Sequence, residues 1–285
     1  MTRRRFPVGK TLLYGFMSLW ALTTIYPFIW VILNSFKPRG LIRSDTFSLP
    51  IGDKFTLENY VTAFKRVDIG TAYVNSIVIS GAVTVVVMVL AGLAAYAMVR
   101  YSFRLRGFLH SMIIASMMFP VFSTIIPVFR MESSWGIVNT GSIWLTRLSV
   151  VLPQIAGNLS FAIIVLMGFI RSLPVDLEEA AYLEGYNVYQ IFFRIIMPLA
   201  KPSFATVGIF TFLWSYNDLF LQMFFLRSKK FFTIPRLLNE ISSQAGTNYG
   251  LMVAAVVMVV IPVLVVYIFL QNYIIKGMTA GAVKG

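Results

Sequence analysis

Cysteine is absent from this chain of 285 residues, and histidine occurs only once, as His110. The missing thiols exclude disulfides, thiolate metal sites and cysteine redox chemistry. A lone histidine leaves a Ser–His pair or a histidine-rich metal site without its parts. Charge is also scarce, since Asp, Glu, Lys and Arg together make up 12% of the residues. Little of the usual catalytic inventory is therefore present.

Hydrophobic residues, by contrast, make up 58% of the chain, and the mean hydropathy is +0.79. A soluble core could not bury so much apolar surface. A bilayer core about 30 Å thick needs roughly 20 apolar residues per helix, and uncharged runs of this length recur along the chain. We predict an all-α membrane protein with six transmembrane helices. They are expected near residues 11–33, 72–98, 108–130, 148–170, 203–225 and 250–272.

The first apolar run follows a basic start formed by Arg3, Arg4, Arg5 and Lys10, as in a signal peptide. The run is longer than a typical signal-peptide core, and no small-x-small cleavage site stands out before Lys37. We therefore expect a retained helix.

Basic residues give a net charge of +13, but they flank the apolar runs instead of forming one nucleic-acid-binding face. An even number of spans puts both termini on one side. Tight basic clusters without acids occur in the N-terminal tail and at Arg100–Arg106, so the positive-inside rule favours a cytoplasmic location for both termini. The connections 34–71, 131–147 and 226–249 would then face outside.

The segment 172–198 predicts two short helices joined at a bend. Pro174 and the acids that follow it suit a helix N-terminus, and Gly185 suits a left-handed helix stop. Asn187 and Gln190 resemble a capping box that opens the second helix. Adjacent alanines allow close backbone approach, and Glu179 offers a carboxylate to a partner's cation. An ordinary interfacial helix would show the same local features.

The full spacing of this segment resembles the EAA signature of importer permeases in the ABC transporter superfamily. The matching residues are Glu179, Ala180, Ala181, Gly185, Ile195 and Pro198, with Met197 where the family usually has Leu. Thr56–Tyr60, Asn75-Ser76, Arg100–Phe103 and Gln271–Gly277 resemble corresponding segments of the maltose-type second permease of the carbohydrate uptake branch. The resemblance covers nearly the whole chain.

That resemblance implies a type I ABC importer transmembrane domain over residues 11–275, between a cytoplasmic basic tail (1–10) and a cytoplasmic C-terminal tail (276–285). Segment 172–198 would be a coupling helix that docks on a cytoplasmic ATPase, with Glu179 as the charged contact. The implied partners are a sister permease in a heterodimer, two ABC ATPase subunits and an extracytoplasmic sugar-binding protein. The chain would reside in a bacterial or archaeal cytoplasmic membrane and import a sugar, in particular an oligosaccharide.

No cofactor is expected on this chain, and ATP and magnesium would bind the partner ATPases. Gly9-Lys10-Thr11 resembles the end of a phosphate-binding loop, but Arg4 occupies the place of the earlier glycine and no strand precedes it. ATP hydrolysis is therefore assigned to other chains.

Within the predicted spans, Asp218 is the only acid, and a buried carboxylate in a membrane needs an explanation. Aromatic and polar residues surround it, which is the mixture that holds a neutral sugar, and the segment also resembles the family's aromatic-Asn-acid motif. The candidate substrate-path residues are Trp214, Tyr216, Asn217 and Asp218, with Asn158 and Ser160 in the fourth span. Interhelical packing and hydrogen bonding is the alternative role.

Other functions remain as alternatives. A permease for a non-sugar or a sugar-phosphate solute would carry the same signature. An intramembrane aspartyl enzyme lacks a second intramembrane carboxylate to pair with Asp218. An ion-coupled carrier would need internal repeats with paired broken helices, and no convincing repeat is found.

Overall fold

The computed structural model describes residues 8–66, 68–244 and 248–282, and every regular element in these ranges is a helix. The basic cluster Arg3–Arg5 and the last three residues of the predicted C-terminal tail lie outside the described residues. The longest helices are α1 (Val8–Ser35), α4 (Ile69–Arg100), α7 (Ile143–Ile170), α11 (Lys201–Asn217) and α14 (Tyr249–Ala282). Most of the remaining elements are short helices between them.

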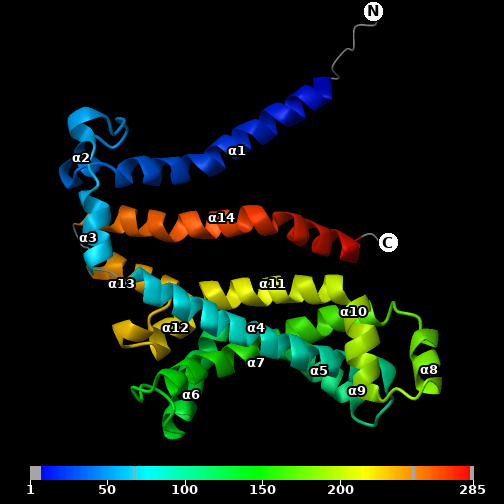
Figure 1. Ribbon diagram of the computed structural model, residues 1–285. Coiled ribbons are helices and arrows are strands. Elements are labelled where there is room, and N and C mark those ends of the chain that lie inside the picture. The colour runs from blue at the N-terminus through cyan, green and yellow to red at the C-terminus, as the bar shows by residue number, and fades with distance from the viewer. Residues whose placement is uncertain (1–7, 67, 245–247, 283–285) are drawn as a thin grey trace, which may run out of the picture. The chain divides into compact units, whose positions relative to one another are not determined.

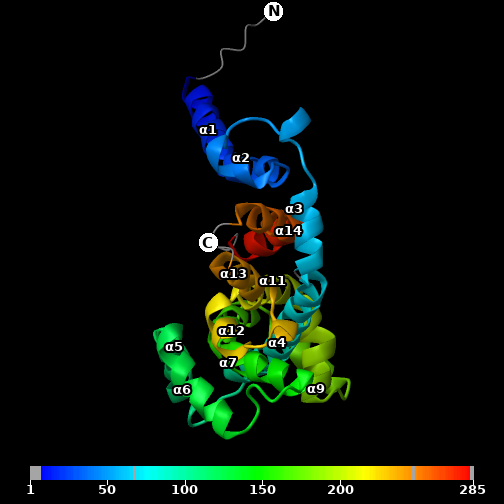
Figure 2. The ribbon, with the colours of Figure 1, turned by 90° about the vertical axis from the view of Figure 1, so that its left-hand side faces the viewer.

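The chain forms two compact units, one of residues 1–68 with 238–264 and one of residues 69–237 with 265–285. The core of the second unit is a three-helix packing of α4, α7 and α11, which run alongside one another in Figures 1 and 2. Val83, Val87, Ala91 and Ala95 recur every fourth residue on α4 and are fully buried. Residues at this spacing share one helix face, and the alanines let the neighbouring helices approach closely.

The third predicted span, 108–130, is not one helix. Two helices occupy this region, α5 (Arg106–Ser116) and α6 (Val121–Ser134), and they are bent by 104° at the break. Pro120 lies at the break, where it lacks an N–H and has an extended backbone. Proline also disfavours a helical conformation in the residue before it, so a helix that arrives from Ser116 stops here.

The fifth predicted span, 203–225, is also interrupted. Helix α11 ends at Asn217, Asp218 has an extended backbone with ψ 91°, and α12 (Leu219–Phe225) follows. The Asp218 carboxylate accepts a hydrogen bond from the Leu221 N–H at 3.1 Å and so caps α12. Asp favours the N-cap position because its side chain can satisfy a free N–H there. The intramembrane acid therefore starts a new helix.

In the first unit, the segment Thr56–Tyr60 anchors the C-terminal end of α1. The Thr56 N–H bonds the Phe36 carbonyl at 2.7 Å, and the Tyr60 hydroxyl lies 2.6 Å from that of Ser35. Asn59, at the start of α3 (Glu58–Arg66), donates to the carbonyls of Ser35 and Lys37 at 2.9 and 2.8 Å. The orphan carbonyls at the helix end are thus satisfied by side chains of this motif.

Lys37 is fully buried just beyond α1, near α2 (Arg39–Ser44). Its ammonium donates to the carbonyls of Asp45 and Thr46 at 3.0 and 2.8 Å. Burial lowers the pKa of Lys37, and the charge of Asp45 partly offsets that effect. The buried cation therefore holds the connection after α1 in a fixed loop.

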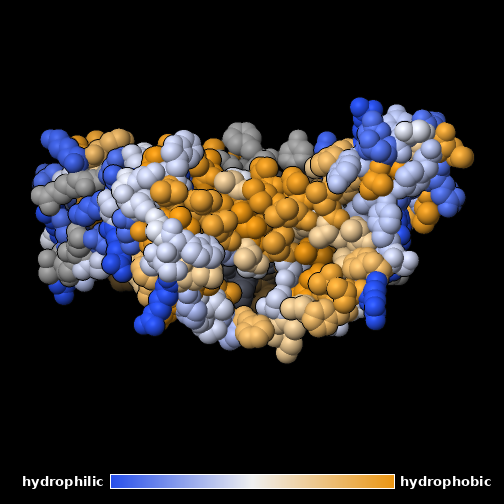
Figure 3. All heavy atoms as spheres, turned by 90° about the horizontal axis from the view of Figure 1, so that it is seen from below, coloured by the Kyte–Doolittle hydropathy of each residue, from blue (hydrophilic) through white to orange (hydrophobic). Residues whose placement is uncertain are grey.

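Among the residues that the structure describes, three helices, α1, α4 and α7, are long and apolar enough to cross a membrane. The number is up to five if α5 with α6, and Val188–Leu199 with α11, each form one strongly bent span. The first half of α14, Tyr249–Val265, is a shorter apolar helix. Figure 3 shows a face on which apolar side chains form a broad band between polar residues at both ends. Large exposed apolar side chains such as Phe122 and Leu152 would be unfavourable in water but suit lipid or partner helices.

Candidate functional site

The EAA segment forms the predicted pair of short helices. The first is α8 (Asp176–Leu183), with Asp176, Glu178 and Glu179 in its first turn. Carboxylates in the first turn are favourable because the free N–H groups there carry partial positive charge. A helix of this length is marginal alone, so its packing against the rest of the unit determines its position.

Helix α8 ends at Leu183, and Gly185 two residues later is the predicted helix stop. Gly185 has a φ of +84°, its N–H bonds the Tyr182 carbonyl at 3.0 Å, and the Tyr186 N–H bonds the Ala181 carbonyl at 3.0 Å. This pair of bonds is a Schellman motif, in which glycine adopts the left-handed conformation most easily.

The second short helix, α9 (Val188–Ile191), begins with the predicted capping box. The Asn187 side chain accepts from the Gln190 N–H at 2.9 Å, and the Gln190 side chain accepts from the Asn187 N–H at 2.8 Å. A π-helical turn, η2 (Phe192–Ile196), and α10 (Met197–Leu199) continue it. Pro198 has no N–H to bond the Arg194 carbonyl, which weakens the regular ladder in this region.

The signature residues of this segment divide between its surface and its core. Glu179, Ala180 and Pro198 are exposed, whereas Ala181 is buried and Ile195 packs partly buried against the core. Leu183 is 91% exposed, and Leu177 and Tyr182 are also exposed. An isolated helix that presents large apolar side chains beside a free carboxylate suits a protein partner.

Glu178, next to Glu179, points into the unit. Its carboxylate accepts from the Tyr96 hydroxyl at 2.8 Å and from Arg100 Nε at 2.5 Å. Arg100 also donates to the Leu173 carbonyl at 2.9 Å. The side chains of Arg100 and Glu178 are 11% and 5% exposed. This ion pair was not predicted from the sequence, in which Glu178 is only one of the acids that follow Pro174 and its partner lies 78 residues away.

The two ends of α4 are held by different parts of the chain. Tyr96 and Arg100 contact the segment of α8, as just described. At the other end, Asn75 donates to the carbonyls of Lys230 and Phe232, and the Ile234 N–H donates to the Ser76 hydroxyl. Residues 75 and 96 of a helix are about 30 Å apart, which is the thickness of a bilayer core. The 229–234 loop and α8 therefore lie at opposite ends of a membrane-length helix.

The exposed candidates for the substrate path lie on α11. Trp214 is 47% exposed and packs edge-on against Phe161 with ring centroids 4.8 Å apart. Asn217 is exposed, three residues later on the same side, and its amide donates to the Leu213 carbonyl at 2.8 Å. Tyr216 lies on another side and stacks on Phe212 at 5.8 Å. Trp214 and Asn217 thus form an aromatic and amide surface.

Two other candidates, Asp218 and Asn158, join a polar network. The Gln154 amide donates to Asp218 at 3.0 Å, and its oxygen accepts from the Ser215 hydroxyl at 2.6 Å. Buried Asn158 donates to the Gln154 carbonyl at 2.7 Å. Ser160 lies apart, 2.5 Å from the Ser116 hydroxyl. Gln154 and Ser215 were not predicted as members of this network, although each is a polar residue inside an apolar run.

The network continues past the helix break. Gln222 donates to the Ser215 carbonyl at 3.0 Å and accepts from the Thr233 hydroxyl. Both side chains are buried. The Asp218 carboxylate thus has two hydrogen-bond donors within the chain, the Gln154 amide on α7 and the Leu221 N–H on α12.

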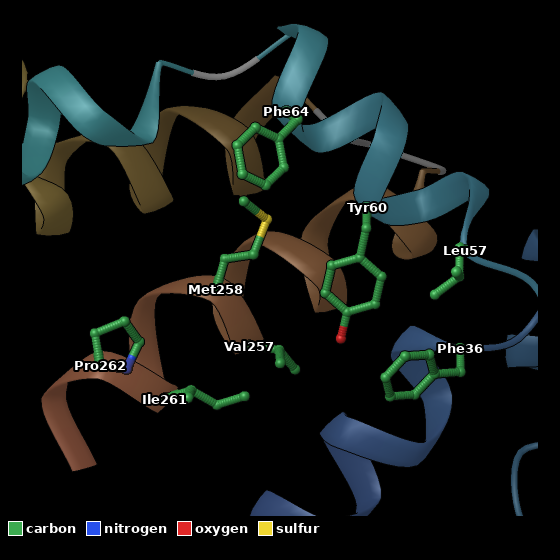
Figure 4. A pocket seen from close by; sticks show the side chains of 8 residues that line it. All are labelled: Phe36, Leu57, Tyr60, Phe64, Val257, Met258, Ile261 and Pro262. Atoms are coloured by element: carbon green, nitrogen blue, oxygen red, sulfur yellow. The ribbon is translucent and has the colours of Figure 1, made fainter. Parts of the chain in front are cut away.

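A cavity of about 480 Å³ lies in the first unit, where α3 and the first half of α14 meet the residue after α1 (Figure 4). It is lined by Phe36, Leu57, Tyr60, Phe64, Val257, Met258, Ile261 and Pro262. The Tyr60 hydroxyl is already paired with Ser35. This lining suits an apolar group and lacks the several polar side chains that would be needed to bind a carbohydrate. Within the described ranges, no three Asp, Glu or His side chains are grouped as in a metal site.

Comparison with known proteins identifies the family. Residues 88–280 match the model of the binding-protein-dependent transport system inner membrane component. The chain is 33% identical to the diacetylchitobiose uptake system permease NgcG of Streptomyces coelicolor, over 95% of this chain and 88% of that protein. It is 32% identical to the trehalose transport system permease SugB of Mycobacterium tuberculosis, over 98% and 96%.

A solved structure shares the fold. It is a crystal structure of a bacterial ABC transporter involved in the import of the acidic polysaccharide alginate, with a TM-score of 0.80 and 22% identity over 96% of this chain and 99% of that one. The resemblance stated from the EAA segment is confirmed by these matches. The chain belongs to the family of inner membrane components of binding-protein-dependent transport systems, as an all-helical, multi-pass and non-catalytic ABC transporter permease.

Proposed function

We propose that this chain is one permease of a heterodimeric pair that imports an oligosaccharide by alternating access. The observation that carries the proposal is the exposed face of α8, which includes Glu179 and Leu183. The first turn of the same helix is fixed to the unit by the ion pair between Glu178 and Arg100. Relatives along nearly the whole chain are named for diacetylchitobiose and trehalose transport, which favours a sugar over a non-sugar or sugar-phosphate solute.

The coupling segment 172–198 docks on a cytoplasmic ABC ATPase. Glu179 makes the charged contact, and exposed Ala180 lets the two backbones approach. Gly185 sets the angle between α8 and α9, while Ile195 and Pro198 join the segment to the membrane helices. Two such ATPases bind ATP and magnesium and close on hydrolysable nucleotide, and the coupling helices pass that closure to the permeases.

Residues 11–275 act as the type I transmembrane domain with six spans, and the tails 1–10 and 276–285 lie in the cytoplasm. The bent pair α5 and α6 and the broken pair α11 and α12 each serve as one span. This orientation puts α8 inside and the 229–234 loop outside, where the extracytoplasmic sugar-binding protein docks. The contacts of these two segments with opposite ends of α4 support their placement on opposite sides of the membrane, and the positive-inside rule supplies the direction.

The sister permease covers apolar surface of this chain. Side chains from Gly9 to Ile29 are exposed, including Trp20 and Phe16, and the two rings stack at 6.4 Å. Such a surface suits contact with lipid or with a partner helix. In a permease pair, the bilayer supplies the lipid and the sister permease supplies the helix.

Trp214 and Asn217 are the substrate contacts that we favour on this chain. An exposed indole stacks on a sugar face, and an amide three residues away supplies a donor and an acceptor for hydroxyls. Asp218, Asn158 and Ser160 would act through the shape of the path, because their polar groups are paired inside the chain. Tyr216 lies beside Phe212 and would act in the same indirect way.

The test is uptake by cells or proteoliposomes that hold the full complex, supplied with radiolabelled diacetylchitobiose, trehalose and melibiose. We expect one of these sugars to enter in an ATP-dependent manner. Glu179→Ala should weaken ATPase docking by roughly 2 to 5 kcal/mol, because it leaves the partner's cation unpaired in the interface. Uptake and co-purification of the ATPase should fall together.

Glu184→Ala is the matched control, since it removes the same charge at the other end of α8, where Glu184 is exposed. It should leave uptake near the wild-type level. Uptake of none of the sugars, or equal effects of the two alanine variants, would contradict the proposal. Hydrolysis of ATP by the purified chain alone would contradict it as well.

A further inference from the structure

The base of α8 is joined to α4 by a buried charged cluster of Tyr96, Arg100 and Glu178. Both oxygens of the Glu178 carboxylate are used, one by the Tyr96 hydroxyl at 2.8 Å and one by Arg100 Nε at 2.5 Å. Arg100 uses a second nitrogen to hold the Leu173 carbonyl, just before α8 begins. The guanidinium thus contacts the helix at its first turn and the backbone that leads into it.

The cluster is rigid for a geometric reason. Tyr96 and Arg100 are four residues apart on α4, so they project from the same face in its last turn. A guanidinium is a planar fork, and two fixed acceptors leave it one orientation. The charges are largely withdrawn from water, so separation of the pair would leave an uncompensated buried charge. Helix α8 therefore cannot tilt away from α4 at low cost.

From this cluster, close contacts continue to α11. The Tyr96 ring packs against Phe192 with centroids 5.6 Å apart, and Phe192 opens the π-helical turn η2. One turn earlier on α4, Gly92 lies so close to two rings that an added Cβ would be 2.9 Å from Phe192 and 2.8 Å from Phe204 of α11. Helix α4, the turn η2 and α11 are thus closely packed at this point, so a displacement of one presses on the others.

A weaker hydrogen bond joins α8 to Tyr101, the residue just after α4. The hydroxyls of Tyr101 and Tyr182 lie 2.8 Å apart, and both rings are exposed. Solvent competes for this bond, so the buried cluster is the contact that resists force.

We infer that the Glu178, Arg100 and Tyr96 cluster is a clamp that makes α4 move together with α8. The adjacent acids Glu178 and Glu179 then have different roles in coupling. Glu179 binds the ATPase, and Glu178 binds the membrane core of its own chain. The inference rests on the proposed function, because it assigns a role inside the same coupling segment. Glu178, Arg100 and Tyr96 are positioning residues that touch neither nucleotide nor sugar.

The clamp predicts a phenotype that differs from that of a docking defect. In Glu178→Gln and Arg100→Gln, the exposed face of α8 keeps its residues, so the ATPase should still co-purify at the wild-type level. ATP hydrolysis should continue, but movement of α8 should no longer be passed on faithfully. Uptake of the sugar panel should fall about tenfold or more, while the ATP hydrolysed per sugar rises.

A double-mutant cycle tests whether the two residues act as one unit. The Glu178→Gln and Arg100→Gln double variant should lose no more uptake than the worse single variant. Tyr96→Phe removes one hydroxyl and should be milder than either. Arg104→Gln removes an exposed charge four residues beyond Arg100 and should be neutral.

The outcomes separate the two proposals. ATP-driven uptake and ATPase co-purification by the wild-type complex test the proposed function, and the variants test the clamp. Normal uptake in both single variants, or losses that multiply in the double variant, would overturn the clamp. Loss of the ATPase from Glu178→Gln would also overturn it, because Glu178 would then belong to the docking surface.

Discussion

At the scale of single residues, neighbours in the EAA segment have opposite surroundings. Glu178 is buried and paired on two sides, whereas Glu179 is exposed. Ala180 is exposed and Ala181 is buried in the same way. Consecutive residues on a helix are about 100° apart. Glu179 and Ala180 can therefore face a partner, while Glu178 and Ala181 on either side of them face the core.

Gly185 gives a prediction at this scale. An added Cβ would meet no atom within 4 Å, so the obstacle to substitution is the φ of +84° and not space. Gly185→Val should cost at least about 1 to 2 kcal/mol of local free energy and misdirect α8 against α9, because β-branched residues are poorly tolerated in the left-handed region. We expect a sharp loss of sugar uptake with nearly normal membrane insertion, measured by transport assay and immunoblot.

Gly185→Asn is the matched variant, since asparagine enters the left-handed conformation more readily than valine. It should keep most of the uptake. If the two substitutions are equally harmful, the loss has a cause other than backbone conformation.

At the scale of elements, the irregular places have local chemical causes. Pro120 separates α5 from α6, and Pro198 follows the π-helical turn and precedes an 82° bend between the α9 to α10 segment and α11. Asp218 ends α11 and caps α12. Proline is also found inside α1, α7 and α14, where the helix continues. The residue type alone does not decide between a kink and a break, since packing around it also contributes.

The anchoring of α1 by α3 gives a second prediction. Asn59 is 2% exposed and its amide serves two carbonyls near the end of α1. Asn59→Ala would leave both acceptors buried without this donor, at roughly 1 to 3 kcal/mol each. We expect a midpoint of thermal unfolding several degrees lower in detergent, followed by intrinsic fluorescence.

Glu58→Ala is the control for this change, because Glu58 is the exposed neighbour on the same helix. Its unfolding midpoint should stay closer to that of the wild type, because an exposed first-turn charge contributes only about 0.3 to 1 kcal/mol. A midpoint for Asn59→Ala within a degree of the control would show that water replaces the lost amide and that the anchor is not needed.

At the scale of the whole molecule, the absence of cysteine permits a direct test of topology. Glu184 and Ser228 are both exposed, and they lie in the segments that contact opposite ends of α4. We expect an impermeant thiol reagent to label Ser228→Cys in intact cells and Glu184→Cys only after permeabilisation. Bilayer-length separation of the two segments is the physical reason.

The reverse labelling pattern would invert the orientation and place α8 outside, where no ATPase could reach it. Labelling of both cysteines in intact cells would mean that the two segments lie on one side. The unsubstituted chain supplies the background, since it has no thiol to react.

The sequence by itself determined the membrane class, because long uncharged runs have few other stable environments. It also determined the local form of the EAA segment. Gly185 as a helix stop and the Asn187 to Gln190 capping box depend on residues a few positions apart, so their geometry follows from the local chain. The family followed from the spacing of the same residues, and the matches confirm it.

Only the tertiary structure decided which polar groups meet across the fold. Glu178 pairs with residues 78 and 82 positions away, and Gln154 meets Asp218 64 positions away. No local pattern encodes such pairs, because they depend on which faces of α4, α7 and α11 pack together. Tertiary packing also decided the surroundings of Asp218. Its half-buried carboxylate caps α12 locally and accepts from Gln154 of α7, and a carboxylate withdrawn from water is stable only where donors pair with it.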